Sequence, residues 1–411
     1  MVLRLVEDCL MSNAKKFACA VAILIIAFLC WLYYTGTFGP HPRFVKTTFS
    51  QLANWDQDNQ VAALNAFKQS CTAILKKDLN LDFHHIPQYG KAKDWQIICL
   101  AANQIKNADN IAARKFFESW FEPYQVESNF NSSGLFTGYY LPLLHGSLKR
   151  NKQNTVPIYG LPNDLVKVNL STFHPELGNH TLVGQLKDHT LIPYPDRATI
   201  LNDTFGKKAP VLVWGNNQLD VFFAQIQGSA IVALPKHKQM MLGYASGNGQ
   251  PYTAIGKVLV QNNALKKSEV SMQSIRDWLT THPQQINKIL NQNANYVFFR
   301  ILKSNQPVGT EQIPVTPERT LAVDTQYIAL GAPIWLDTVV PEKVSASIPF
   351  QHLLIAQDTG GAIKGVVRGD VYWGAGEKAA YTAGHMASRG QYWVLLPRHH
   401  DVGATGWSPS R

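Results

Sequence analysis

The chain has little charge for its length and is poor in acidic residues. Charged residues make up 16% of its 411 residues, with 28 Asp and Glu against 38 Lys and Arg. Aromatic residues make up 11%, and no composition typical of disorder is present. The formal net charge of +10 suits a polyanionic partner, such as nucleic acid, an acidic membrane face or an acidic polysaccharide. The alternative is a surface that is simply basic. A chain of this length is expected to form two domains.

Cysteine is scarce, with five in the whole chain. Three lie in or before an apolar N-terminal segment, and only Cys71 and Cys99 remain outside it. Both fall in helix-like stretches, AALNAFKQSCTAILKKDL and WQIICLAANQIKN. An even pair in an oxidising compartment predicts a disulfide that joins two packed helices, and two separate buried thiols are the alternative.

Several catalytic motifs are missing. GYASGNGQPYTAIG lacks the Lys-Ser/Thr ending of a phosphate-binding loop. The histidine pairs at 84–85 and 399–400 have no cysteine or carboxylate at metal-ligand spacing, so no metal site is predicted. QGSA, which contains Ser229, is not the G-x-S-x-G elbow of a serine hydrolase. The DTG at 358–360 is similar to the loop of aspartic proteases, but those enzymes need two such aspartates and this chain has one DTG.

The N-terminus contains FACAVAILIIAFLCWLYY, residues 17–34, a stretch of 18 residues without charge. It is long enough to span a bilayer with little to spare. Lys15 and Lys16 precede it and are expected to stay in the cytosol, which would export the rest of the chain. A cleavable signal peptide is the alternative, although no A-x-A site follows. Cys30 is a poor lipidation site because Leu29, just before it, is not small.

The pattern of apolar residues changes near residue 133. Residues 50–122 show helical periodicity, for example at Val61, Leu64 and Phe67. Later residues form short apolar runs between Gly, Pro and Asn, such as VLVWG, LDVFFAQIQGSAIVAL and KGVVRGDVYW. These runs predict many short strands, and hence barrels or sandwiches. One helix is expected to interrupt them, at SEVSMQSIRDWLTTHPQQINKILNQN.

Two aspartates flank a glycine-rich run in AQDTGGAIKGVVRGDVYWGAGEKAAYTAGH, residues 356–385. Asp358 lies at an expected strand end, before a double glycine. Asp370 lies in an apolar and aromatic strand, where burial by Tyr372 and Trp373 would raise its pKa toward that of a useful proton donor. Either aspartate could instead only accept backbone N–H bonds in a turn.

The stretch DTGGAIKGVVRGDVYWGAGEKAAYTAGHM closely resembles the C-terminal signature of the membrane-bound lytic murein transglycosylase A family. Other stretches resemble further blocks of that family, in the family's order, and together they cover roughly residues 60–397. They are GLFTGYY, IPYPDRATI, FFAQIQGSA, GYASGNGQPYTAIGKVL, NYVFFR and VTPERTLAVDTQYIALGAPIWLDT. Several long motifs in one order make the match specific.

The resemblance implies a mainly β fold, in which a double-psi β-barrel carries an inserted second β domain. An N-terminal helical segment and a transmembrane anchor complete the expected architecture. The expected divisions are a cytoplasmic N-terminus (1–16), a transmembrane or signal anchor (17–34), a linker (35–49), a helical N-terminal region (50–129), a catalytic barrel (130–142 plus 296–398), an inserted β-rich substrate-groove domain (143–295) and a tail (399–411).

Enzymes of this family cleave the β-1,4 bond between N-acetylmuramic acid and N-acetylglucosamine in peptidoglycan without adding water. The muramyl C6 hydroxyl attacks C1 and leaves a 1,6-anhydro end, so one aspartate acts as acid and then as base. Asp370 matches the family's catalytic aspartate, and Asp358 matches its other aspartate, which would orient or polarise the site. A catalytically silent peptidoglycan-binding scaffold and a hydrolytic glycosidase of the same fold are the alternatives.

The resemblance also implies substrate-binding residues, partners and a location. The positions that match the family's groove are Thr137, Tyr139, Gln227, Gly228 and Ser229. Lys364 is expected to bind the lactyl or peptide carboxylate of muramic acid. No cofactor, metal or nucleic-acid partner is implied. The expected partners are peptidoglycan glycan strands and, through the N-terminal segment, a membrane. The expected location is the periplasmic face of a bacterial membrane, with an inner-membrane anchor rather than outer-membrane lipidation.

Overall fold

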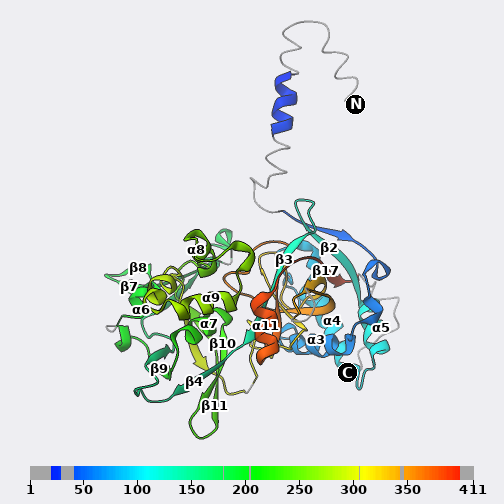
Figure 1. The fold of residues 1–411 in the computed structure, drawn as a ribbon. Coiled ribbons are helices and arrows are strands. Elements are labelled where there is room, and N and C mark those ends of the chain that lie inside the picture. Colours follow the sequence, from blue (N-terminus) through cyan, green and yellow to red (C-terminus); the bar gives the residue numbers. More distant parts are fainter. Residues whose placement is uncertain are drawn as a thin grey trace.

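The structure of the protein is a computed structural model. It describes residues 20–28, 41–178, 180–202, 205–304, 306–342 and 347–398. Figure 1 shows two bodies side by side, one built around a barrel with helices against it and the other containing the middle third of the chain.

Half of the expected anchor over 17–34 falls outside the described residues. Within it, residues 20–28 are helical. None of the helices in the described ranges is both long enough and apolar enough to cross a membrane. The expected cytoplasmic N-terminus (1–16) and tail (399–411) lie wholly outside the description.

Three helices form the N-terminal region, and they are α3 (Gln60–Ile74), α4 (Ala92–Gln104) and α5 (Asn110–Trp120). α3 begins where the side chain of Asn59 accepts a hydrogen bond from the N–H of Ala62. α5 begins in the same way, with the Asp109 carboxylate accepting from the N–H of Ala112. The helical periodicity expected up to residue 122 therefore identifies real helices, but α5 ends at Trp120, before a strand.

A disulfide links Cys71 of α3 to Cys99 of α4, with the two Cα atoms 5.3 Å apart. Both residues are fully buried. The two packed helices are thus joined covalently as well as by their apolar faces.

A six-stranded ring forms the barrel. Its strands are β3 (Gly134–Leu141), β13 (Thr320–Val323), β14 (Pro333–Val340), β15 (Ile348–Asp358), β16 (Arg368–Ala375) and β17 (Ala387–Pro397). The order around the ring is β17-β14-β15-β13-β16-β3, and β3 closes it by pairing with β17. The β13–β15 and β16–β3 pairs are parallel, and the other pairs are antiparallel. The expectation of a mainly β fold with a barrel is confirmed.

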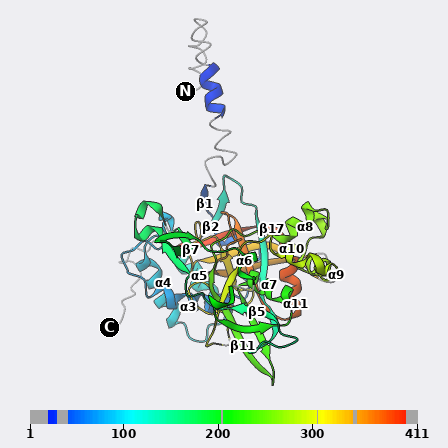
Figure 2. The same ribbon diagram turned by 90° about the vertical axis from the view of Figure 1, so that its left-hand side faces the viewer.

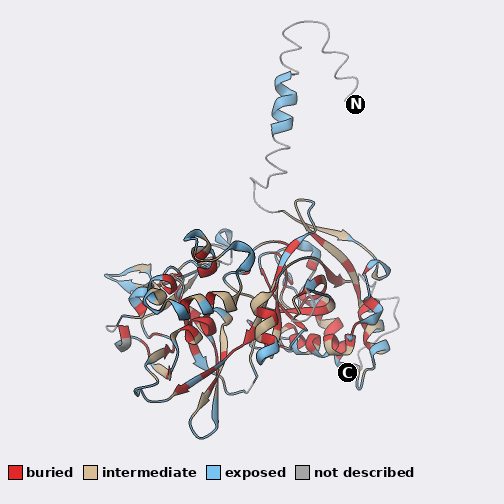
Figure 3. Ribbon diagram, in the orientation of Figure 1, coloured by how far each residue is buried: buried red, intermediate tan, exposed pale blue. Residues whose placement is uncertain are grey.

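Outside the ring, β2 (Phe121–Ser128) pairs with β17, and β1 (Pro42–Lys46) pairs with β2. The helix α11 (Glu377–His385) connects β16 to β17. One apolar core fills the barrel and continues between its wall and α3, α4 and α5, and it includes the fully buried Phe67, Trp95 and Trp335. Figure 3 shows this buried region in red across the helices and barrel together.

The other body comprises two sheets and five helices of the described chain. Its strands are β4 (Leu143–Ser147), β5 (Val156–Tyr159), β6 (Val166–Asn169), β7 (Thr181–Lys187), β8 (Thr190–Pro193), β9 (Val211–Gly215), β10 (Ser229–Leu234), β11 (Lys238–Gly247) and β12 (Val297–Ile301). Its helices are α6 (Arg197–Ile200), α7 (Gln218–Gln227), α8 (Ile255–Gln261), α9 (Met272–Thr281) and α10 (Ile286–Leu290). The sheets run β12-β11-β10-β4-β9-β5 and β6-β7-β8.

Three local expectations are wrong in this body. The apolar run LDVFFAQIQ was expected as a strand, but it forms α7, and only SAIVAL after it forms a strand, β10. The single helix expected after residue 267 is interrupted at Pro283, which separates α9 from α10. Strand β12, placed with the barrel by the expected boundary at 296, pairs with β11 instead.

The two bodies meet through α9 and α11, which lie together in both Figure 1 and Figure 2. The amide of Gln273 in α9 donates a hydrogen bond of 3.4 Å to the carbonyl of Ala380 in α11. A second junction lies between α7 and β3, and the candidate site is found there.

Candidate active site

Two aspartates and a threonine lie in one row across the barrel. Ala322 of β13 is the register partner of Asp358 on β15 and also of Asp370 on β16. Asp370 is in turn the register partner of Thr137 on β3. Residues opposite one another on neighbouring strands project to the same face, so these carboxyl and hydroxyl groups share a face. The two aspartate Cα atoms are two strand spacings apart, or about 10 Å.

Asp370 is held by a hydroxyl and, through it, by a guanidinium. Oγ1 of Thr137 donates a hydrogen bond of 2.6 Å to Oδ1 of Asp370. Nη2 of Arg368 donates one of 2.7 Å to the same threonine oxygen, so the single hydroxyl hydrogen points at the carboxyl group. Burial raises the pKa of Asp370, while the charge of Arg368 and the hydrogen bond from Thr137 oppose the rise.

Asp358 accepts three hydrogen bonds. The hydroxyl of Tyr139 donates to Oδ2 at 3.1 Å, and the hydroxyl of Thr310 donates to Oδ1 at 2.9 Å. The N–H of Thr359 also donates to Oδ1, at 2.9 Å. Burial raises the pKa of Asp358 to about 6, although these three hydrogen bonds act to lower it; the charge of Asp370 adds to the rise.

Tyr139 lies under the influence of both carboxyl groups. Burial raises its pKa well above the usual value, and the charges of Asp358 and Asp370 raise it further. The phenol therefore stays a neutral hydrogen-bond donor. Its ring centroid lies 5.1 Å from that of Tyr372, its register partner on β16.

The inserted body reaches the site through the end of α7. Gln227 is the last residue of this helix, and its side-chain oxygen accepts a hydrogen bond of 2.9 Å from the N–H of Tyr140 in β3. Gly228 caps the helix at φ 78°, a left-handed conformation that favours glycine, and its N–H donates to the carbonyl of Ala224. Ser229, partly exposed, begins β10.

A small cavity opens at this junction of the two bodies. Its polar lining residues are Tyr139, Tyr140, Gln227, Ser229, Asp358 and Tyr372. Its apolar lining includes Leu141 of β3, and Val308 and Val315 from the segment between β12 and β13. Polar groups that converge on an apolar wall are typical of ligand-binding sites.

Most of the site residues expected from the sequence come together here. Thr137 binds Asp370 and Tyr139 binds Asp358 on one face of the barrel, and Gln227 and Ser229 line the cavity together with Tyr139 and Asp358. Lys364 does not join them. It lies in the turn between β15 and β16, its side chain is 70% exposed, and its ammonium is 3.9 Å from the Asp324 carboxylate.

Two neighbours of the aspartates are not predicted from the sequence. Thr310 comes from the segment between β12 and β13, and no local pattern marks it as a partner of Asp358. Tyr252 precedes α8 in the inserted body. Burial raises the pKa of Tyr252, and the charge of Asp370 raises it further. Tyr252 is therefore close enough to Asp370 for their charges to interact. Tyr252 belongs to the stretch GYASGNGQPYTAIGKVL, which does carry a recognisable signal.

The arrangement supports proton exchange with a bound molecule. Asp370, a half-buried carboxyl group with one hydroxyl partner, can hold a proton closer to neutral pH than an ordinary aspartate. The three donors around Asp358 act to lower its pKa, while burial raises it to about 6. Among the residues that the structure describes, no group of three or more His, Cys, Asp or Glu is placed to hold a metal ion.

Comparisons with known proteins agree on one group of relatives. Residues 135–300 match the family described as the MltA specific insert domain, and residues 319–396 match the 3D domain. The chain is 34% identical over 263 residues to the membrane-bound lytic murein transglycosylase A homolog of Buchnera aphidicola subsp. Schizaphis graminum. That alignment covers 63% of this chain and 65% of the relative, so the chain spans just under two thirds of that relative's length.

Solved structures resemble the chain over most of its length. The monoclinic crystal form of MltA from Neisseria gonorrhoeae matches with a TM-score of 0.71 and 32% identity, over 87% of this chain and 94% of that one. A membrane-bound lytic murein transglycosylase from Agrobacterium tumefaciens matches with a TM-score of 0.77 and 26% identity, over 86% of this chain and 98% of that one.

Proposed function

Because the chain belongs to the membrane-bound lytic murein transglycosylase A family, we propose that it cleaves the β-1,4 bond between N-acetylmuramic acid and N-acetylglucosamine in peptidoglycan without adding water. The product is a glycan with a 1,6-anhydromuramic end. The observation that carries the proposal is the placement of Asp370, hydrogen-bonded to Thr137, on the same barrel face as Asp358, which lines the cavity.

In the proposed reaction, Asp370 carries out both proton transfers. Its protonated carboxyl group gives a proton to the leaving O4 as the C1–O4 bond breaks. The resulting carboxylate then accepts the proton of the muramyl C6 hydroxyl as O6 bonds to C1. Asp370 recovers the proton that it gave, and no water takes part, so one carboxyl group is enough for the whole reaction. A hydrolase with two carboxyl groups needs the second one as nucleophile or as base for water.

The neighbours of Asp370 serve its two protonation states. Burial favours the protonated form that the first step needs. The Thr137 hydroxyl orients the group, and the nearby charge of Arg368 stabilises the carboxylate that remains after the first transfer. Asp358, with a pKa of about 6, is mostly ionised at neutral pH and polarises the site as positive charge develops at C1.

The cavity lining supports a role in glycan binding. Tyr139 offers a ring face and a hydroxyl, Gln227 an amide, and Ser229 a hydroxyl, all of which suit sugar hydroxyl and acetamido groups. Gly228 leaves open space beside the turn, because a Cβ there would meet nothing within 4 Å. Lys364 would reach the muramyl or peptide carboxylates from the exposed turn beside the site.

The proposal assigns a different role to each part of the chain. The six-stranded ring, formed by β3 and by the strands from β13 to β17, serves as a double-psi barrel, and its two parallel strand pairs support that topology. Residues 143–295 supply the other side of the glycan groove. The uncharged segment 17–34, with lysines before it, anchors the enzyme in the inner membrane at the periplasmic face. Relatives that carry the name "membrane-bound" support attachment to a membrane.

The mass of the products tests the reaction. Purified peptidoglycan incubated with the full chain should release muropeptides lighter by one water than those from a hydrolase. Water-containing products would instead indicate a conventional glycosidase, and no soluble product would indicate a binding scaffold. Asp370→Asn should abolish release while thermal unfolding stays close to that of the wild type, and Asp358→Asn should weaken release less.

A further inference from the structure

Gln357 is a fully buried amide near the end of β15, in the wall of the barrel. It lies in β15 between Ala356 and Asp358, and its exposed fraction is 0%. Its neighbours before it in the strand are apolar, from Leu353 to Ala356. A buried primary amide costs free energy unless its hydrogen-bonding groups are satisfied, so its partners indicate what it does.

Gln357 is the extra residue of a β-bulge. On the parallel partner strand, Leu321 pairs with Ala356, but the next residue, Ala322, pairs with Asp358. Gln357 is skipped in the register. Without this insertion Ala322 would lie opposite Gln357, and Asp358 would fall on the other face of the sheet. The bulge therefore puts the Asp358 carboxylate on the same face as Asp370.

The side chain of Gln357 is bound at both ends of its amide. Its oxygen accepts a hydrogen bond of 2.5 Å from the hydroxyl of Thr320 on β13. Its nitrogen donates to the carbonyl of Ala66 at 2.9 Å and to the hydroxyl of Ser70 at 3.1 Å. Ala66 and Ser70 are four residues apart on α3 and lie on one buried face of that helix. Both amide hydrogens are used.

We propose that Gln357 is a positioning residue for the reaction, whose side chain pins the bulge to α3 and so holds Asp358 beside Ala322 and on the face of Asp370. The inference rests on the function proposed above. It gives the N-terminal helices, which precede both family matches at 135–300 and 319–396, a part in building the site. Ser70 is followed directly by Cys71, so the disulfide to α4 steadies the same turn of α3.

The first test uses steady-state kinetics of the full chain. Gln357→Met keeps the length of the side chain and removes all three hydrogen bonds. It should lower kcat by about 100-fold, the scale of a misplaced catalytic group, and leave KM nearly unchanged. Ser70→Ala, a milder change, removes one acceptor and should give a smaller loss of kcat in the same direction.

Gln60→Met is the matched control, because Gln60 is also a fully buried glutamine and lies on the same helix. Its side-chain amide donates to the carbonyl of Trp55, a residue outside β15. Compared below the unfolding temperature of every variant, Gln60→Met should lose stability but keep the wild-type kcat. Wild-type kcat in both Gln357→Met and Ser70→Ala would overturn the positioning role.

A crystal structure of Gln357→Met separates this inference from the proposed activity. The expected result is loss of the bulge or a rotated Asp358, with Ala322 no longer opposite that residue. If Asp358 stays beside Ala322 in the variant, the positioning inference is wrong, whether or not the wild type has the proposed activity. If the wild type releases no anhydro product, the proposed function fails, and the crystallographic result still decides whether Gln357 places Asp358.

Discussion

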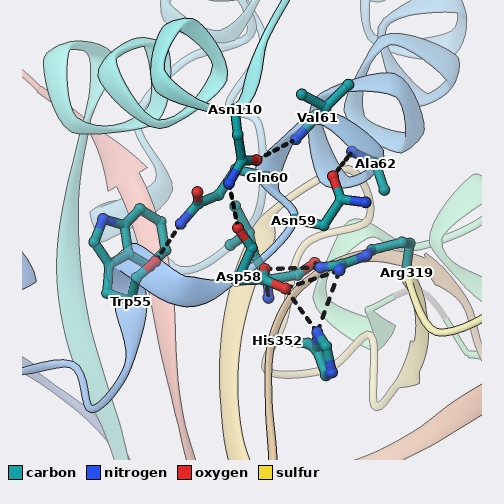
Figure 4. A network of polar contacts seen from close by, with 10 residues as sticks. Trp55, Asp58, Asn59, Gln60, Val61, Ala62, Asn110, Arg319 and His352 are labelled. Carbon is teal, nitrogen blue, oxygen red and sulfur yellow. Dashed lines mark hydrogen bonds and ion pairs between the residues drawn. The ribbon is translucent and has the colours of Figure 1, made fainter.

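The carboxylate of Asp58 accepts hydrogen bonds from both terminal nitrogens of Arg319, at 2.7 and 2.8 Å (Figure 4). Asp58 comes just before α3 and Arg319 just before β13, so the pair ties the helical region to the barrel. Nδ1 of His352 lies 2.7 Å from the same carboxylate, and the N–H of Leu353 donates to it at 2.9 Å. The two charged side chains are 0% and 7% exposed, so this is a buried, bidentate pair.

Asp58→Asn should destabilise the protein by about 3 to 5 kcal/mol, because it leaves the buried guanidinium of Arg319 without a counter-charge. Urea denaturation followed by circular dichroism measures the loss. Asp56→Asn is the matched control, since Asp56 is two residues away and exposed, and it should change stability little. Equal losses in the two variants would contradict the importance of the buried pair.

The same pair should make stability depend on acidity. Burial tends to raise the pKa of Asp58, but the hydrogen bonds from His352 and Arg319 and the charge of Arg319 outweigh it and lower the pKa from 3.8 to about 2. A lowered pKa stabilises the fold above about pH 4, and that contribution, about 2 kcal/mol, is lost as the pH falls toward 2. The difference in unfolding free energy between the wild type and Asp58→Asn should therefore shrink over this range. A difference that stays constant there would count against the assignment.

Arg368→Met should move the pH dependence of activity. Asp370 acts first as an acid, so the basic limb of kcat/KM reports its pKa. The charge of Arg368 lowers that pKa, and its removal should shift the limb to higher pH. The value of kcat should also fall, because the Thr137 hydroxyl loses the donor that directs it. Arg389→Met, an exposed arginine on β17, is the control and should leave the limb in place. A limb that moves to lower pH would contradict this role.

Removal of the disulfide should destabilise the helical region. Cys71 and Cys99 are 28 residues apart in sequence, and closing a loop of that size is worth roughly 3 to 4 kcal/mol in the chain-entropy description. The double variant Cys71→Ala/Cys99→Ala should show this loss in denaturant titrations. A reductant should destabilise the wild type by a similar amount and leave the double variant unchanged. If a reductant also lowered the stability of the double variant, a disulfide formed by other cysteines would have to explain the loss.

Local sequence patterns account for much of the fold, and they also account for some of the errors in predicting it. Periodic apolar residues predicted the helices before residue 120, and short apolar runs predicted a mainly β remainder, which the ring and the two further sheets confirm. The run containing α7 was misassigned because a short apolar segment has no distinct period. Its limits were nevertheless present in the sequence, since Asn217 caps its start and Gly228 its end.

The sequence by itself determined the family, which the comparisons confirm, because long motifs such as DTGGAIKGVVRGDVYW are continuous strings. It also singled out Asp358 and Asp370 as candidates for the chemistry, and those roles stay predictions. Only the tertiary structure decided which groups surround them. Thr137 reaches Asp370 across 233 residues, and Ser70 reaches Gln357 across 287. Such contacts depend on strand register, on one bulge and on how α3 packs against β15, and no local pattern specifies these.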